Sequence, residues 1–285
     1  LLPQAYWSPF YLAILKWIIQ VKGNLKIGNS AFKEAIIEKY LKDPENVLLA
    51  HRLTASYFLK MVEQEKPGAR EFTELPYALF YSNNYNGFVD FYANRETLKN
   101  AWSYSPSLVT QYFYLPEKHD IGNFSDIINQ EIASSDDYTR LQVEDVDYLV
   151  TVAEIFQAMG YYDQAKMFWN MIAGVGQQNN NDEQLEIGVS HLAFLEMQSG
   201  NTDKAIGLYE HLLQLFEHKN AEEDIVSTYH NLGLCFQSKE ENEQAYQYFE
   251  KAALYFEEKK NTPKLLRALI NCSNTLERME KYEEA

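Results

Sequence analysis

The sequence predicts an all-α fold, namely a right-handed superhelical solenoid of stacked helical hairpins. Hydrophobic residues make up 46% of the 285 residues and aromatic residues 14%, which is enough for a sizeable core. The chain has only 12 Gly and 8 Pro, too few for the many tight turns of a β-sandwich or barrel. A spacing of 40 residues recurs between Ala165 and Ala285, and internal repeats of about this length are typical of solenoids. We therefore expect regular hairpins in residues 146–285 and divergent hairpins in residues 1–145.

The first 145 residues contain helical patterns without the 40-residue spacing. The apolar stretch Pro9–Val21 is short and is broken by Lys16 and Gln20, so we expect a buried helix there and not a membrane span. The N-cap signal Asn29–Ser30 begins a helix that Asp43–Pro44 ends. Further helices are expected at Pro44–Glu63, Leu75–Phe91 and Thr97–Tyr114. Breaks are expected at Lys66–Gly68, Asn83–Gly87 and Ser103–Pro106. We expect Gly122–Ile127 to be a degenerate copy of the later turn and second helix. These helices either continue the solenoid or form a separate helical region.

The second half repeats one pattern at every fortieth residue, marked by Ala165, Ala205, Ala245 and Ala285. An acidic residue stands two positions before each alanine. Four positions after the first three alanines comes an aromatic residue, and twelve positions before them a small one: Trp169, Tyr209 and Phe249, and Ala153, Ala193 and Gly233. These spacings put small residues where two helices pack closely. Gly160 and Gly200, replaced later by Glu240 and Glu280, occupy a turn that favours positive φ. Each repeat is therefore predicted to be a helical hairpin.

The segment Tyr229–Phe256 carries a family resemblance. It reads YHNLGLCFQSKEENEQAYQYFEKAALYF, and its N-L-G, Ala and F-x-x-A positions resemble the tetratricopeptide repeat (TPR). The TPR usually has about 34 residues, so a 40-residue unit implies longer second helices or loops. Repeats of this length resemble those of the Rap, NprR and PlcR bacterial regulators, which are cytoplasmic receptors for short secreted signalling peptides. The resemblance covers about residues 146–285.

Composition and motifs exclude several function classes. The net charge of −16 makes binding of nucleic acid or an anionic membrane by this chain unfavourable, so any DNA contact needs a segment outside it. Cys235 and Cys272 are too few for a disulfide framework, and we expect two core thiols in a reducing, cytoplasmic environment. No phosphate loop, dinucleotide, zinc-protease or nucleophile-elbow motif occurs, and the six histidines lack ligand spacing. We therefore expect no enzymatic activity, no cofactor and no metal.

Charge placement indicates which helices form the inner wall. Lys and Arg are absent from 146–159, 186–199 and 226–238, the first helices of three hairpins, so we expect these helices to line the concave side. The TPR resemblance implies which of their positions face the groove. The candidate peptide-binding residues among these positions are Asn231, Asn271, Asn274, Arg267, Arg278, His230, Gln237, His191, Glu154 and Gln157.

The chemistry of these side chains suits an extended peptide. Amides offer a donor and an acceptor to a ligand backbone, and arginines hold carboxylates in bidentate fashion. Asn231, Asn271 and Asn274 resemble the asparagine ladder of TPR peptide receptors. The alternatives are that Asn231 packs locally, that the two arginines pair with Glu277 or Glu280, and that the histidines are buried polar spacers.

These observations predict the ligand-binding domain of a cytoplasmic bacterial regulator, which senses a short extended peptide and relays it to an effector or DNA-binding region. One alternative is a TPR scaffold for a protein partner. Another is a Rap-like response-regulator phosphatase or inhibitor. The resemblance also implies homodimerisation through terminal hairpins. Because the chain opens at Leu1 without Met or a signal peptide, and stops at Ala285 within a hairpin, we expect it to be part of a longer protein.

Overall fold

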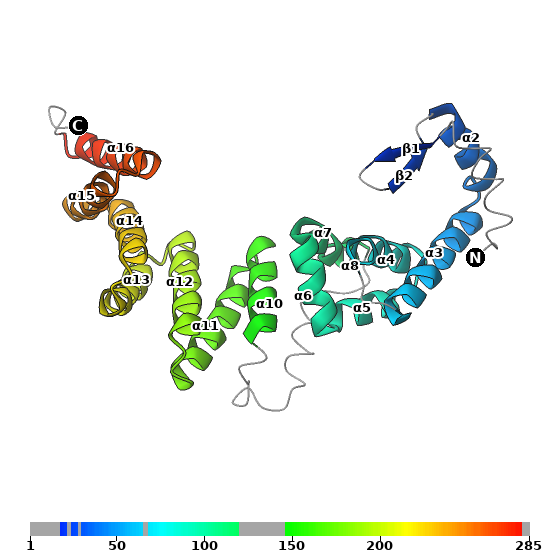
Figure 1. Cartoon of the computed structure of the whole chain (residues 1–285), viewed down its shortest axis with the longest axis horizontal. Coiled ribbons are helices and arrows are strands. Elements are labelled where there is room, and N and C mark those ends of the chain that lie inside the picture. Colours follow the sequence, from blue (N-terminus) through cyan, green and yellow to red (C-terminus); the bar gives the residue numbers. More distant parts are fainter. Residues whose placement is uncertain (1–17, 22–23, 28–29, 65–67, 120–145, 281–285) are drawn as a thin grey trace. The chain divides into compact units, whose positions relative to one another are not determined.

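The computed structural model describes residues 18–21, 24–27, 30–64, 68–119 and 146–280 (Figure 1). The chain divides into two compact units. The first comprises Leu1–Leu108 and Leu115–Ile127, and the second comprises Val109–Tyr114 and Ile128–Ala285. Helices dominate the described residues of both units, and the predicted all-α solenoid class is confirmed. The expected copy at Gly122–Ile127 lies outside the described residues.

The first unit contains one short β-hairpin. Strand β1 (Ile18–Val21) pairs antiparallel with β2 (Asn24–Ile27), with Ile18 opposite Ile27. The predicted helix Pro9–Val21 is therefore wrong in its last four residues, and its earlier part lies outside the described residues. The physical reason is that three of the four residues in β1 are β-branched, which favours strand over helix.

The helices of the N-terminal half largely follow the sequence signals. They are α2 (Ser30–Tyr40), α3 (Pro44–Gln64), α4 (Ala69–Tyr81), α5 (Tyr85–Ala93), α6 (Arg95–Tyr104), α7 (Pro106–Phe113) and α8 (Leu115–Lys118). The predicted breaks near residues 83 and 105 are confirmed, whereas most of the predicted break at Lys66–Gly68 lies outside the described residues, between the end of α3 and the start of α4. Helix α4 starts six residues before the expected Leu75, and it includes Pro76. Phe88, Tyr92 and Leu98 are among the fully buried side chains that hold these helices together.

The second unit is a series of hairpins with the predicted period. Its helices are α10 (Val146–Ala158), α11 (Tyr162–Gln178), α12 (Asp182–Gln198), α13 (Thr202–Lys219), α14 (Glu222–Ser238), α15 (Asn242–Glu258) and α16 (Thr262–Arg278). Each helix packs against the next one in sequence. We call α10, α12, α14 and α16 the first helices, and α11, α13 and α15 the second helices. The residues beyond the usual TPR length lie in helices, since both members of the later hairpins have 17 or 18 residues.

Residues with positive φ end the helices at fixed places in the repeat. The turn after each first helix holds Gly160 (+80°), Gly200 (+78°), Glu240 (+63°) or Glu280 (+61°), which confirms the predicted turn positions. The turn after each second helix has its own residue with positive φ. These residues are Asn180, Asn220 and Lys260, again 40 residues apart. Left-handed residues therefore set both helix lengths in the repeat.

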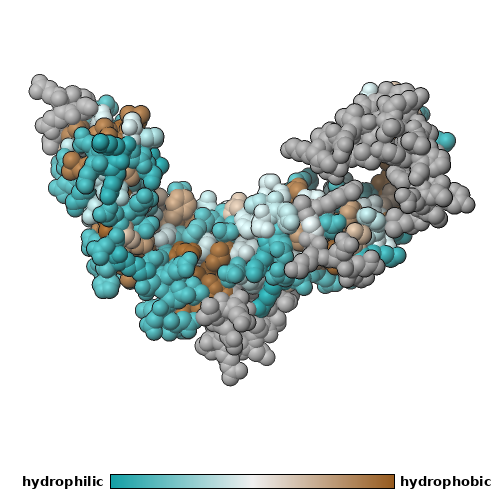
Figure 2. Space-filling view, in the orientation of Figure 1, coloured by the Kyte–Doolittle hydropathy of each residue, from teal (hydrophilic) through white to brown (hydrophobic). Residues whose placement is uncertain are grey.

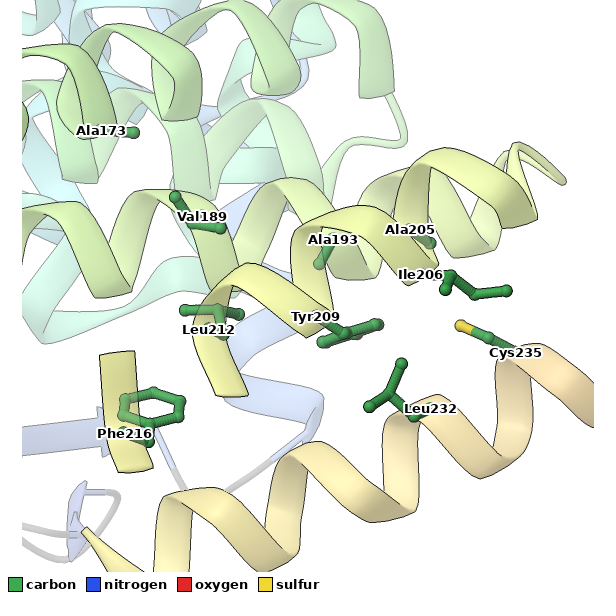
Figure 3. Packing of buried hydrophobic residues seen from close by; sticks show 10 residues of the cluster. All are labelled: Ala173, Val189, Ala193, Ala205, Ile206, Tyr209, Leu212, Phe216, Leu232 and Cys235. Carbon is green, nitrogen blue, oxygen red and sulfur yellow. The ribbon is translucent and has the colours of Figure 1, made fainter. Parts of the chain in front are cut away.

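The core of the second unit consists of the residues that define the repeat. Ala165, Ala205 and Ala245 are fully buried, as are the aromatic residues four positions later. Figure 3 shows Ala193 of α12, Ala205 and Tyr209 of α13, and Leu232 of α14 in one cluster. The two cysteines are free and buried, which confirms their predicted place in the core.

Candidate functional site

Polar contacts connect successive first helices, which are the predicted inner wall. Gln157 of α10 lies 3.2 Å from the His191 ring of α12. Between α14 and α16, Gln237 donates to Thr275 across 3.2 Å. These helices are separated by a complete second helix in the sequence, yet their polar side chains are in direct contact. The first helices therefore lie side by side at these two steps, as the repeat frame predicts.

A cavity of about 220 Å³ lies between α14 and α16. Three predicted residues line it, namely His230, Asn231 and Arg267. The other lining residues are Val226, Ser227, Phe256, Lys264 and Ala268. Val226 and Ala268 are 3% and 2% exposed and form an apolar base. The cations are Lys264 and Arg267, the amide is Asn231 and the hydroxyl is Ser227. The cavity thus combines a small apolar surface with donors suited to carboxylate or carbonyl oxygens.

His230 connects two other candidate residues. Arg267 Nη2 lies 2.7 Å from His230 Nε2, and the Asn271 amide lies 3.3 Å from Nδ1. Because a guanidinium only donates, Nε2 is the acceptor and Nδ1 carries the proton. The Asn271 amide faces Nδ1 with its nitrogen, Nδ2, and becomes the acceptor for the Nδ1 proton when its oxygen and nitrogen exchange places. Burial, followed by the Arg267 charge, lowers the pKa of His230 from 6.5 to about 4, so the neutral imidazole holds both side chains in place.

Another polar network joins α10 to α12. The His191 ring stacks on Trp169 with ring centroids 3.8 Å apart. Gln157 Oε1 accepts a hydrogen bond from the Trp169 indole at 3.1 Å and lies 3.2 Å from His191 Nδ1. Burial lowers the pKa of His191, while the charge of Glu154 opposes this shift. Gln157 and His191 therefore act as polar spacers between helices, which is the alternative that the sequence left open for the histidine.

The remaining candidate residues have different surroundings. Asn274 and Arg278 are exposed on α16, and Glu154 is half-buried on α10. Gln237 donates to Thr275, which itself donates to the Asn271 carbonyl. Within residues 146–280 no ion pair joins Arg267 or Arg278 to Glu277 or Glu280, so the alternative pairing of the arginines is absent there.

Five of the eight residues at the cavity were not among the candidates. Two of these five, Lys264 and Phe256, lie on the two sides of the turn between α15 and α16. Asn261 caps α16 by accepting from the Lys264 backbone N–H at 3.3 Å. This cap and the following Pro263 were the signals in the sequence for a helix beginning at Thr262. With that start, the Lys264 side chain falls one turn before Arg267 on the same face.

Ion pairs lie where first and second helices meet at their ends. Lys219 is 3.3 Å from Asp182, and Lys259 is 2.8 Å from Glu222, so the same pair recurs 40 residues later. Hydrophilic residues cover much of the visible surface of α13–α16, interrupted by hydrophobic patches (Figure 2). Exposed ion pairs of this kind contribute little stability because water and salt screen them, so they align the hairpins more than they stabilise them.

Comparisons with known proteins support the repeat. Residues 224–285 match the tetratricopeptide repeat family, and this segment contains α14 except for its first two residues, α15, α16 and the whole cavity lining. No curated protein matches the chain. A solved structure of BtubC (BKLC) from P. vanneervenii is 14% identical over 85% of this chain and 86% of that chain, with a TM-score of 0.47. This likeness is too distant to indicate a function. The resemblance to Rap, NprR and PlcR regulators stays a prediction.

Two further classes of site were sought in the described residues. No helix there combines the length and apolar composition needed to cross a membrane. No group of three or more His, Cys, Asp or Glu side chains there is arranged to hold a metal ion. The cavity between α14 and α16 is the candidate functional site of the second unit.

Proposed function

We propose that the second unit is a peptide-binding module whose site lies between α14 and α16. The observation that carries this proposal is the cavity of about 220 Å³ with an apolar base and a rim of Lys264, Arg267, His230 and Asn231. TPR domains bind peptides or proteins, and residues 224–285 match this repeat. In a chain of net charge −16, two cations beside an apolar pocket favour a ligand with a carboxylate next to a hydrophobic side chain.

The proposed contacts follow from the chemistry of the rim. Arg267 and Lys264 hold the carboxylate, and the neighbouring side chain enters the pocket over Val226 and Ala268. Asn231 pairs with the ligand backbone, and Asn271 and Asn274 extend the row of amides along α16. Gln157 and His191 are left out of this set because they do not line the cavity and belong to the network between α10 and α12. The role is binding and not catalysis.

The finer proposal is that the ligand is a short signalling peptide and that the chain is the sensor domain of a cytoplasmic bacterial regulator. Its effector or DNA-binding region then lies in another segment, and binding changes the packing between successive hairpins. The resemblance in the repeat length supports this form. A scaffold that binds the tail of a protein partner is equally compatible with the TPR match and uses the same contacts.

Affinity selection from defined peptide pools tests the proposal. The chain is incubated with a random heptapeptide pool carrying free C-termini and, separately, with the same pool amidated. We expect enrichment of free-acid peptides with an apolar final residue. Arg267→Gln should weaken their binding about tenfold or more, since a hydrogen bond between charged groups contributes roughly 1.5 to 3 kcal/mol. Lys204→Gln on α13, an exposed lysine outside the cavity, is the matched control.

The outcomes also separate the two forms of the proposal. Equal enrichment from both pools, or unchanged binding by Arg267→Gln, would contradict the carboxylate site. Enrichment that persists for isolated heptapeptides supports a short signal. Enrichment that requires the same sequence at the end of a longer polypeptide supports the scaffold.

A further inference from the structure

A second cavity lies in the first unit, between α3 and the turn that joins α4 to α5. Its volume is about 580 Å³. Helix α3 and the turn supply the lining residues Arg52, Ala55, Ser56, Leu59, Lys60, Ser82, Asn83 and Asn84. Six of these eight residues are polar or basic and none is acidic. In a chain with 41 acidic and 25 basic side chains, this pocket carries a local excess of positive charge.

The wall formed by α3 presents cations on one face. Arg52, Ser56 and Lys60 are spaced four residues apart, so their side chains share one side of the helix. Ala55 and Phe58 are buried and hold α3 against the rest of the unit. Within the described part of the chain, no hydrogen bond or ion pair involves Arg52 or Lys60. Both charges are therefore available to a ligand.

The turn adds donors to the opposite wall. Asn83 adopts a left-handed φ of +61°, and its Oδ1 accepts from the Tyr85 hydroxyl at 3.0 Å. Asn84 caps α5, and its Oδ1 accepts from the Gly87 backbone N–H at 3.1 Å. Since both amide oxygens are already used, each asparagine has its NH₂ group left to donate. The positive end of the α5 dipole adds to the same polarity.

We propose that this pocket binds a phosphate group. The lining supplies a guanidinium, an ammonium, two amide NH₂ groups and a hydroxyl, with no carboxylate to compete. A carboxylate has one charge and two oxygens, whereas phosphate has up to two charges and more acceptor oxygens. Phosphate therefore matches both the pair of cations and the number of donors. The group belongs either to a free phosphate compound or to a phosphorylated side chain, and the chemistry of recognition is the same.

NMR titration of the ¹⁵N-labelled chain at constant ionic strength tests this proposal. The probes are inorganic phosphate, N-acetyl-phosphoserine amide and acetate. We expect saturable shifts of the Asn83 and Asn84 side-chain NH₂ signals with both phosphate probes. The double variant Arg52→Gln/Lys60→Gln should bind at least about tenfold more weakly, because it loses two charged donors. Both positions are exposed, and Gln is a good helix former, so the fold is expected to persist.

A matched double variant provides the control. Lys33→Gln/Lys42→Gln removes the same charge from exposed positions outside the cavity and should bind phosphate like the parent chain. Shifts of the same size in both double variants, an absence of saturable shifts, or equal affinity for acetate would each overturn the proposal. Tighter binding of the phosphoserine derivative than of inorganic phosphate would support a phosphorylated protein segment, and equal binding would support a free phosphate compound.

Discussion

Gly233 lies where α14 makes close contact with the Phe249 ring of α15. A Cβ added at this position would be 2.5 Å from Cε1 and 2.9 Å from Cζ of that ring. Carbon atoms prefer separations of about 3.5 to 4 Å. Phe249 is completely buried and stands at the aromatic position of the repeat, so its ring cannot move into solvent. We therefore expect Gly233→Ala to push the two helices apart or to force the ring out of its preferred rotamer.

The magnitude follows from two opposing effects. Overpacking a core by one methyl group typically costs about 1 to 3 kcal/mol. Alanine is a better helix former than glycine by about 1 kcal/mol, which offsets part of this cost. Because the nearest contact of Gly233 falls about 1 Å short of an ordinary contact, the upper part of the range applies. We expect Gly233→Ala to lower the free energy of unfolding by roughly 1 to 2 kcal/mol.

Urea unfolding followed by circular dichroism measures this difference. Gly207→Ala on α13 is the matched control, because no atom lies within 4 Å of a Cβ added there. That variant should gain roughly 0.5 to 1 kcal/mol from helix propensity alone. The same chemical change is thus predicted to have opposite signs at two glycines. If Gly233→Ala were as stable as the parent chain, the close approach of α14 to Phe249 would be wrong.

Three further predictions concern the turns, the cavity and the core thiols. Glu240→Gly should raise the free energy of unfolding by roughly 0.5 to 1 kcal/mol, because Glu240 has a strained φ of +63° that glycine adopts freely. The control Glu243→Gly inside α15 should lower the free energy of unfolding by about 1 kcal/mol. Urea curves in which both variants lose stability would contradict the backbone strain at Glu240. Burial first, and the neighbouring guanidinium second, lower the pKa of His230 from 6.5 to about 4. Between these two pH values the imidazole is protonated in the unfolded chain and neutral in the folded chain. The free energy of unfolding therefore falls as the pH drops from about 6.5 to about 4. This loss is roughly 1 to 2 kcal/mol after solvent screening of a half-buried group, and it should shrink in His230→Gln; identical pH profiles would refute it. Burial raises the pKa of Cys235 and Cys272 to about 11. Their reaction with a thiol reagent at pH 8 should therefore be on the order of 100-fold slower in the folded than in the unfolded chain. Comparable rates in the two states would show that the thiols are accessible.

The repeat made most of the second unit predictable. A pattern that recurs every 40 residues identifies helix-packing positions, because a small residue and an aromatic residue recur at fixed positions in each copy. The positive φ of Glu240 shows how strong this argument is. Glutamate has no local preference for that conformation, and it was predicted only because Gly160 and Gly200 stand at the equivalent positions.

The first unit was less predictable because it offers no second copy of its pattern. Local signals located the breaks near Asn83 and Ser105, where capping and turn residues act over a few positions. They failed at Ile18–Val21, since a short apolar run is compatible with either a helix or a strand. Pairing with Asn24–Ile27 makes this run a strand, and no local signal within the run indicates such a partner.

The candidate site shows why a repeat frame predicts the face of a residue but not its partner. Equivalent positions 40 residues apart hold His191, Asn231 and Asn271, and all three side chains are half-buried on first helices. His191 stacks on Trp169 and bonds to Gln157, whereas Asn231 lines the cavity between α14 and α16. The difference arises from contacts between neighbouring repeats, because Trp169 supplies an indole N–H that its counterparts Tyr209 and Phe249 lack.

The presence of Trp169 in one repeat and Phe249 in a later one affects the polar contacts between first helices. The indole of Trp169 donates to Gln157 and helps to fill the space between α10 and α12 with an internal network. At the equivalent position Phe249 offers only a ring, 5.8 Å from His230, and His230, whose counterpart on α10 is Val150, contacts Arg267 and Asn271 on α16. These contacts hold Arg267 at the rim of the cavity between α14 and α16. The aromatic residue of the second helix and the residue at the place of His230 thus together determine which polar contacts join neighbouring first helices.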